Sequence, residues 1–171
     1  MQFAKILSVS FFSILCWHYF TSTDLSDSQK QTEFIAGQDH VKNISIEESK
    51  SYAQYLAVSY TEGQNERLLV CRRDCFFQNR YHYFGGGCSR ERMNFYNVHE
   101  GTSQALIVLY GDNTNPHADS YRFYNNNKVY SKQDLGKYIL ELYLIHDTPD
   151  AGFQGHFYDR AGNVVHESNG A

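Results

Sequence analysis

The order of hydrophobic and polar residues divides the chain into four parts. Residues 6–20 are almost wholly apolar, residues 24–43 are polar, residues 46–62 have apolar positions at helical spacing, and later residues form short apolar runs between polar turns. A change from helical spacing to short runs separated by turns indicates a change from helix to strand. The pattern therefore predicts a leader, a linker and one folded domain.

The first part has the features of a secretory signal peptide. Lys5 supplies a positive charge, an apolar run (ILSVSFFSILCWHYF) follows, and residues 21–23 are small and polar. The run is shorter than the ~20 residues that a membrane-spanning helix needs. We therefore predict that residues 1–23 are a signal peptide and that the protein is secreted or periplasmic. Bulky residues precede the expected cleavage region at residues 21–23, and signal peptidase sites favour small residues. The alternative is therefore an N-terminal segment that stays uncleaved and anchors the protein.

Residues 24–44 are predicted to be a polar linker. They are rich in Ser, Gln, Thr and Asp and contain few large apolar residues. Such a composition buries too little apolar surface to offset the loss of chain entropy on folding. The folded part is therefore expected to be a single domain over residues 45–171.

The segment 46–62 is predicted to be an amphipathic helix. Ser45 and Glu48 have the spacing of a capping box, in which each side chain bonds the backbone amide of the other residue. Gly63 is a plausible end of the helix. The apolar positions form a stripe at helical spacing: Ile46, Ala53, Leu56, Ala57 and Tyr60.

Short strands are predicted for the remainder of the domain, because β-branched and aromatic residues gather between turn residues. Asn residues at 125–127 and the Gly-containing segment 159–163 predict two hairpin turns. The expected strands cover residues 67–71, 76–77, 81–84, 104–110, 121–124, 129–130, 138–146, 153–158 and 163–166.

These elements indicate an α+β fold. One N-terminal amphipathic helix would pack on an antiparallel sheet of about six to eight short strands, since strands without intervening helices pair antiparallel. A small β-barrel is the alternative, which would require most strands to pair and curl. The expected core includes Leu106, Val108, Leu140, Leu142 and Leu144.

Composition and charge limit the classes of partner that the protein could bind. The chain has 14 Tyr, 12 Phe and one Trp, and its net charge is −4. A negative chain argues against nucleic acid as a partner, because phosphate binding needs positive charge. The charge is uneven, however. Six arginines lie between Glu66 and Arg92, in a segment that is also rich in aromatic residues.

Three cysteines follow the leader, and export predicts at least one disulfide. A hairpin that turned at residues 79–80 would place Cys71 opposite Cys88, and Cys75 is the other candidate partner of Cys88. A zinc site that combined these cysteines with His82 or His99 is the rival. Their spacing matches no common zinc pattern, so we expect no metal and no cofactor.

The binding site is predicted in the arginine-rich segment 72–92. Arginines suit carboxylates or phosphates, and aromatic rings supply contact area. The run Gly85–Gly87 is interpreted as a flexible turn. The alternative is that the tyrosines are core residues and the arginines lie on the surface. The candidate residues are Arg72, Arg73, Arg80, Tyr81, His82 and Tyr83.

No catalytic motif is present, since the chain lacks G-x-S-x-G, H-E-x-x-H and a Walker loop. We therefore predict a non-enzymatic binding module, such as an inhibitor or a surface-interaction protein. Its partner would be an extracytoplasmic protein or glycan, with no membrane contact beyond a possible anchor. The alternative is a small secreted hydrolase that uses His146 with Asp147, or His156 with Asp159.

Overall fold

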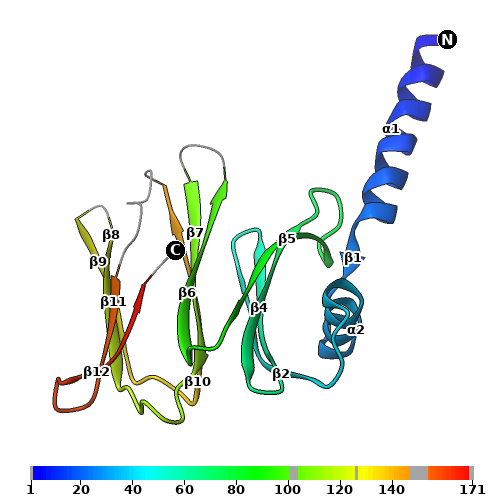
Figure 1. Cartoon of the computed structure of the whole chain (residues 1–171). Helices are drawn as coiled ribbons and strands as arrows, with labels where there is room; N and C mark the ends of the chain where they lie inside the picture. Colours follow the sequence, from blue (N-terminus) through cyan, green and yellow to red (C-terminus); the bar gives the residue numbers. More distant parts are fainter. Residues whose placement is uncertain (1, 101–103, 126, 147–153, 170–171) are drawn as a thin grey trace.

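The computed structural model describes residues 2–100, 104–125, 127–146 and 154–169, and these residues are mostly β. They form twelve strands in three antiparallel sheets, together with two helices (Figure 1). The expected α+β fold, with one helix on one sheet, is therefore wrong. Neither helix in this part of the chain is long and apolar enough to cross a membrane.

The first sheet has the strand order β1-β5-β4-β3-β2. Helix α1 precedes it, and helix α2 lies between β1 and β2 in the sequence. The bounds are α1 Gln2–Thr21, β1 Thr23–Asp24, α2 Ser28–Asp39, β2 Ile44–Tyr52, β3 Tyr55–Glu62, β4 Asn65–Arg73 and β5 Arg80–Ser89.

The second sheet has the order β10-β7-β6, and the third has the order β12-β11-β8-β9. Strand β10 lies beside β2, and β12 lies beside β6, so the sheets fold over one another at these edges without closing into the alternative barrel. The bounds are β6 Met93–Glu100, β7 Gln104–Asp112, β8 Ser120–Asn125, β9 Lys128–Gln133, β10 Tyr138–Ile145, β11 Gln154–Tyr158 and β12 Val164–Asn169.

The elements stack in four layers, with α2 on the outside of the first sheet and the second sheet between the other two (Figure 1). Strand β7 shows how the layers are joined. Leu106 and Val108 point toward the first sheet, whereas Ile107 and Leu109 point toward the third. Because successive strand residues face opposite sides, a sheet covered on both faces needs a continuous apolar run.

The predicted helix 46–62 is wrong, because this segment is the hairpin of β2 and β3. Tyr52 pairs with Tyr55 across a two-residue turn, in which Ala53 has a φ of 52°. Leu56 contributes to the core beneath α2, and Ala57 contributes to the core against the second sheet. The apolar residues thus cover two faces of a strand, and a helical stripe would have covered only one.

Residues 24–44, expected as a linker, contain α2. The Asp27 side chain caps this helix by accepting a hydrogen bond from the Lys30 amide at 2.9 Å. Ile35 of α2 is completely buried against the first sheet, and Leu25 and Val41 belong to the same core. A few well-placed apolar residues therefore dock a short helix that is polar on its remaining surface.

Several predicted strands are confirmed. Residues 67–71 lie in β4, residues 81–84 in β5, residues 104–110 in β7, and both predicted hairpins form, as β8–β9 and β11–β12. Phe76 and Phe77 lie instead in the loop between β4 and β5. His146, the last residue of the predicted strand 138–146, lies just beyond the end of β10. Residue 126 of the predicted turn and residue 153 of the predicted strand 153–158 lie outside the described residues.

The predicted disulfide is also wrong, since all four cysteines are free. Cys71 pairs with Tyr83, and Cys88 pairs with Arg67, because the β4–β5 connection is longer than a tight turn and the ladder shifts after Val70. Cys71 is buried in the core beneath α2, while Cys75 and Cys88 are exposed. The expected register, in which a turn at residues 79–80 places Cys71 opposite Cys88, is therefore wrong.

The glycine run 85–87 belongs to strand β5 and is not a flexible turn. A Cβ atom on Gly86 would lie 2.5 Å from the Leu68 carbonyl oxygen, and one on Gly85 would lie 2.7 Å from the Tyr96 hydroxyl. The Gly86 amide donates to that hydroxyl at 3.1 Å. The glycines therefore allow a close approach between neighbouring chain segments.

Candidate functional site

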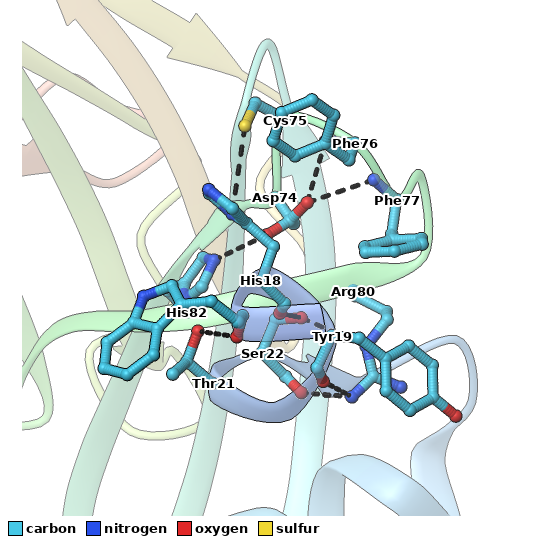
Figure 2. Close-up of polar contacts among 11 residues, drawn as sticks. His18, Tyr19, Thr21, Ser22, Asp74, Cys75, Phe76, Phe77, Arg80 and His82 are labelled. Atoms are coloured by element: carbon cyan, nitrogen blue, oxygen red, sulfur yellow. Dashed lines mark hydrogen bonds and ion pairs between the residues drawn. The ribbon is translucent and has the colours of Figure 1, made fainter. Parts of the chain in front are cut away.

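The end of α1 meets the loop between β4 and β5, and a buried carboxylate lies at the junction (Figure 2). Asp74, directly after β4, has a side chain with no exposed surface. Its Oδ2 atom accepts hydrogen bonds from His18 Nδ1 at 2.8 Å and from His82 Nε2 at 2.7 Å. One carboxylate oxygen thus joins a residue of α1 to a residue of β5.

The second oxygen of Asp74 holds its own loop. Oδ1 accepts from the amides of Phe76 at 2.7 Å and Phe77 at 3.1 Å. Burial raises the pKa of Asp74, but these amide bonds and those from the two histidines outweigh it and lower the pKa to about 2. Asp74 is therefore a carboxylate at neutral pH, and its negative charge is fixed at this place.

Arg80 at the start of β5 holds the last turn of α1. Its Nε donates to Ser22 Oγ at 3.0 Å, and its guanidinium donates to the carbonyls of Tyr19, at 2.6 Å, and Ser22. The guanidinium also lies 4.1 Å from the centre of the Tyr19 ring. Arginine suits such a position, because its planar fork can cap free carbonyls at a helix end.

Aromatic contacts extend this junction. The ring of Phe76 meets His18 edge to face at 4.8 Å, and the ring of Phe77 meets Tyr19 at 5.8 Å. Strand β1 then pairs with β5 directly after the helix. The end of α1 is thus fixed by polar, aromatic and backbone contacts together.

Cys75 brings a thiol to the same place. Its Sγ lies 3.9 Å from His18 Nδ1, and the ligand-type atoms of His18, Asp74 and Cys75 are all within 4.8 Å of one another. In a Cys–His–Asp catalytic arrangement, the thiol and the carboxylate contact different ring nitrogens of the histidine. Here both lie at Nδ1, so the geometry suits a shared ligand better than nucleophile activation.

A hollow of about 380 Å³ opens beside this cluster. Three of the predicted site residues, Arg72, Arg73 and His82, line it together with Phe84. Its remaining lining residues are His18 and Cys75. The hollow is therefore lined by two arginines, two histidines, a cysteine and a phenylalanine.

The other predicted site residues lie elsewhere. Arg80 is used to hold α1, and Tyr81 is buried in the core beneath α2. Tyr83 is exposed and lines a separate hollow of about 180 Å³ beside Arg67 and Cys88. The six candidates are thus divided among four environments, because alternate residues of β5 face opposite sides of the sheet.

The residues proposed for a hydrolase do not converge in the described part of the chain. His156 Nε2 lies 3.7 Å from Glu167, while Asp159 accepts from Asn163 within the β11–β12 turn. His146 Nδ1 lies 2.8 Å from the Gln104 amide nitrogen, and Asp147 is outside the described residues. His156 is therefore paired with Glu167 and not with Asp159, whereas the pairing of His146 with Asp147 falls outside the described residues.

A second buried carboxyl group lies at the opposite end of β4. Glu66 is 8% exposed, and its Oε2 has no hydrogen-bond partner among the residues that the structure describes. Burial first, and then the charges of Asp112 and Glu47, raise its pKa to about 7. It lines a hollow of about 430 Å³ with Arg90 and Arg92.

Two residues of the junction escaped the sequence analysis. His18 lies inside the segment assigned to a signal peptide, and Asp74 carries no motif. The nearness of Asp74, Cys75 and His82 in the sequence could have suggested that these three residues form a cluster. The contact with His18 could not be foreseen in this way, because it spans 56 positions. Comparison of the chain with protein-family models, with curated proteins and with solved structures gives no match, so the chemistry of this junction is inferred from its own geometry.

Proposed function

We propose that the protein is an exported, non-enzymatic binding module that holds an acidic extracytoplasmic protein or glycan at the hollow beside α1. The observation that supports this function is that Arg72 and Arg73 line one hollow with His82 and Phe84. Guanidinium groups bind carboxylate, sulfate or phosphate through paired hydrogen bonds, and the ring supplies apolar contact. An acidic group with an adjoining apolar surface fits this lining.

We propose further that α1 stays attached to the exported protein. The contacts of Asp74 and Arg80 with the last turns of α1 support retention, because cleavage near residue 23 would leave the buried carboxylate without its His18 partner. Helix α1 projects from the sheets (Figure 1). Its exposed apolar residues favour contact with a membrane surface: Phe11, Phe12, Ile14, Trp17, Tyr19 and Phe20.

Titration of the full chain with acidic probes tests the binding function. The probes are a sulfated oligosaccharide and poly-glutamate, and calorimetry measures the affinity. Arg72→Ala with Arg73→Ala should weaken binding by more than tenfold, about 1.4 kcal/mol, with little change in thermal stability. Arg122→Ala with Arg160→Ala removes the same charge from the third sheet and its turn and serves as the control.

Equal affinities for the two double variants would contradict the proposed site. Absence of binding to both probes by the parent chain would contradict the acidic-ligand function. The retention of α1 has its own test, because mass spectrometry of the exported protein shows whether residues 17–23 are still present. A mature N-terminus after residue 20 would contradict it.

A further inference from the structure

We propose that the junction of α1 with the β4–β5 loop is a binding site for a divalent transition metal of the zinc class, with His18, Asp74, Cys75 and His82 as ligands. The proposal departs from the expectation of no metal. That expectation considered only cysteine spacing with His82 or His99, whereas the fold supplies His18 from a distant helix. It does not depend on the proposed acidic ligand, although the hollow is shared.

The distances fit a small metal ion. Zinc bonds of ~2.0–2.3 Å in a tetrahedral arrangement place neighbouring ligand atoms ~3.3–3.6 Å apart. The observed separations from His18 Nδ1 are 2.8 Å to Asp74 Oδ2 and 3.9 Å to Cys75 Sγ. His82 Nε2 is 2.7 Å from the same Asp74 oxygen. One ligand atom each of His18, Asp74 and Cys75 lies within 4.8 Å of the other two, so small side-chain movements would bring these three to bonding distance. His82 would join them through its contact with the same Asp74 oxygen.

The ligand types select the metal. Imidazole and thiolate prefer zinc, cobalt or copper, whereas calcium and magnesium prefer a shell of oxygen atoms. Only one carboxylate contributes here, and two of the other groups are imidazoles. One carboxylate and one thiolate also balance the charge of a divalent ion, which matters because the Asp74 side chain is completely buried.

The protons can be accounted for. In the structure, the two histidines donate N–H groups to Asp74. To bind the ion, the proton on Nδ1 of His18 and the proton on Nε2 of His82 each move to the other nitrogen of the same ring, so that each ring presents a lone pair to the metal. Cys75 loses its thiol proton to solvent. No oxidant or reductant is required.

The site has a structural consequence. Its ligands come from α1, from the β4–β5 loop and from β5, so a bound ion would fix α1 to the first sheet more firmly than hydrogen bonds alone. Metal binding would thus stabilise the folded chain, since the unfolded chain cannot hold these residues together.

Cobalt titration of the full chain under reducing conditions tests the proposal. Cobalt reports its ligands by visible bands and by a near-ultraviolet thiolate-to-metal band. We expect one ion per chain, a thiolate band and displacement of cobalt by zinc. Cys75→Ser should abolish the thiolate band, and His82→Gln should weaken binding by at least tenfold. Cys88→Ser and His156→Gln, at an exposed cysteine and a distant histidine, should leave both unchanged.

Two results would overturn the proposal. One is the absence of cobalt binding by the folded parent chain, which would leave the cluster as a hydrogen-bonded contact only. The other is a thiolate band that survives in Cys75→Ser and disappears in Cys88→Ser. Circular dichroism of each variant ensures that only folded protein is compared. Metal binding without acidic-probe binding would retain this site and reject the proposed function.

Discussion

His18 Nδ1 donates a hydrogen bond to Asp74 Oδ2 at 2.8 Å, which links two residues 56 positions apart in the sequence. His82 donates to the same oxygen. The carboxylate is buried, so its stability in the fold depends on these donors. The contact therefore both fixes α1 and gathers the side chains of the candidate site.

Replacement of Asp74 by asparagine should destabilise the protein strongly. An amide has one acceptor oxygen in place of two, and it directs an N–H group toward the existing donors. We expect the free energy of unfolding to fall by about 3 kcal/mol, as is usual when one partner of a buried charged contact is removed. Urea denaturation at neutral pH measures the change.

Asp27→Asn is the matched control, because Asp27 is an exposed capping residue and asparagine caps helices equally well. Its effect should be within about 0.5 kcal/mol. If Asp74→Asn were as mild as Asp27→Asn, the buried carboxylate would not stabilise the junction.

Glu66 should make stability fall as the pH rises. Its pKa is raised to about 7 from 4.5, so the folded chain binds a proton that the unfolded chain has released between these values. Stability from this group is complete below pH 4.5 and is lost as the pH rises through 7. Asp112 and Glu47 disfavour the charged form, and Arg92 opposes them.

Glu66→Gln should therefore be more stable than the parent chain at pH 8, by about 2 kcal/mol, with the difference vanishing below pH 4.5. Thermal unfolding at several pH values measures it. Glu33→Gln, at an exposed position of α2, should show no such pH dependence. A constant difference for Glu66→Gln would contradict the raised pKa.

Gly86→Ala should destabilise the first sheet. The added Cβ would lie 2.5 Å from the Leu68 carbonyl oxygen, which is backbone and cannot move without disturbing the β4–β5 ladder. We expect a loss of about 2 kcal/mol or more, measured by chemical denaturation. Gly37→Ala in α2 meets no atom within 4 Å and should be neutral or stabilising, since alanine favours helix. A neutral Gly86→Ala would show that the two strands are less closely packed.

Arg80→Lys should release the end of α1 while leaving the sheets intact. Lysine keeps the charge but cannot bond Tyr19 and Ser22 together through a planar fork. Hydrogen exchange of the amides in residues 18–23 should become faster, with little change elsewhere. Arg160→Lys, at a side chain that is 92% exposed, should change neither region. Unchanged exchange near α1 would show that Arg80 does not hold the helix.

The sequence by itself determined many of the strands. The run 104–110 is apolar at nearly every position and is bounded by turn residues, which is sufficient to identify β7. Asparagine and glycine turns located the β8–β9 and β11–β12 hairpins. These features are local, so they can be recognised without knowing what packs against them.

Only the tertiary structure decided which faces are covered. Residues 46–62 have apolar spacing that suits a helix stripe, but β3 is covered by α2 on one side and by the second sheet on the other, so strand geometry buries more of its side chains. The candidate site was hidden for the same reason. His18, Asp74 and His82 meet only because β1 pairs with β5 and places the end of α1 beside the β4–β5 loop, and contacts over such separations leave no periodic pattern in the sequence.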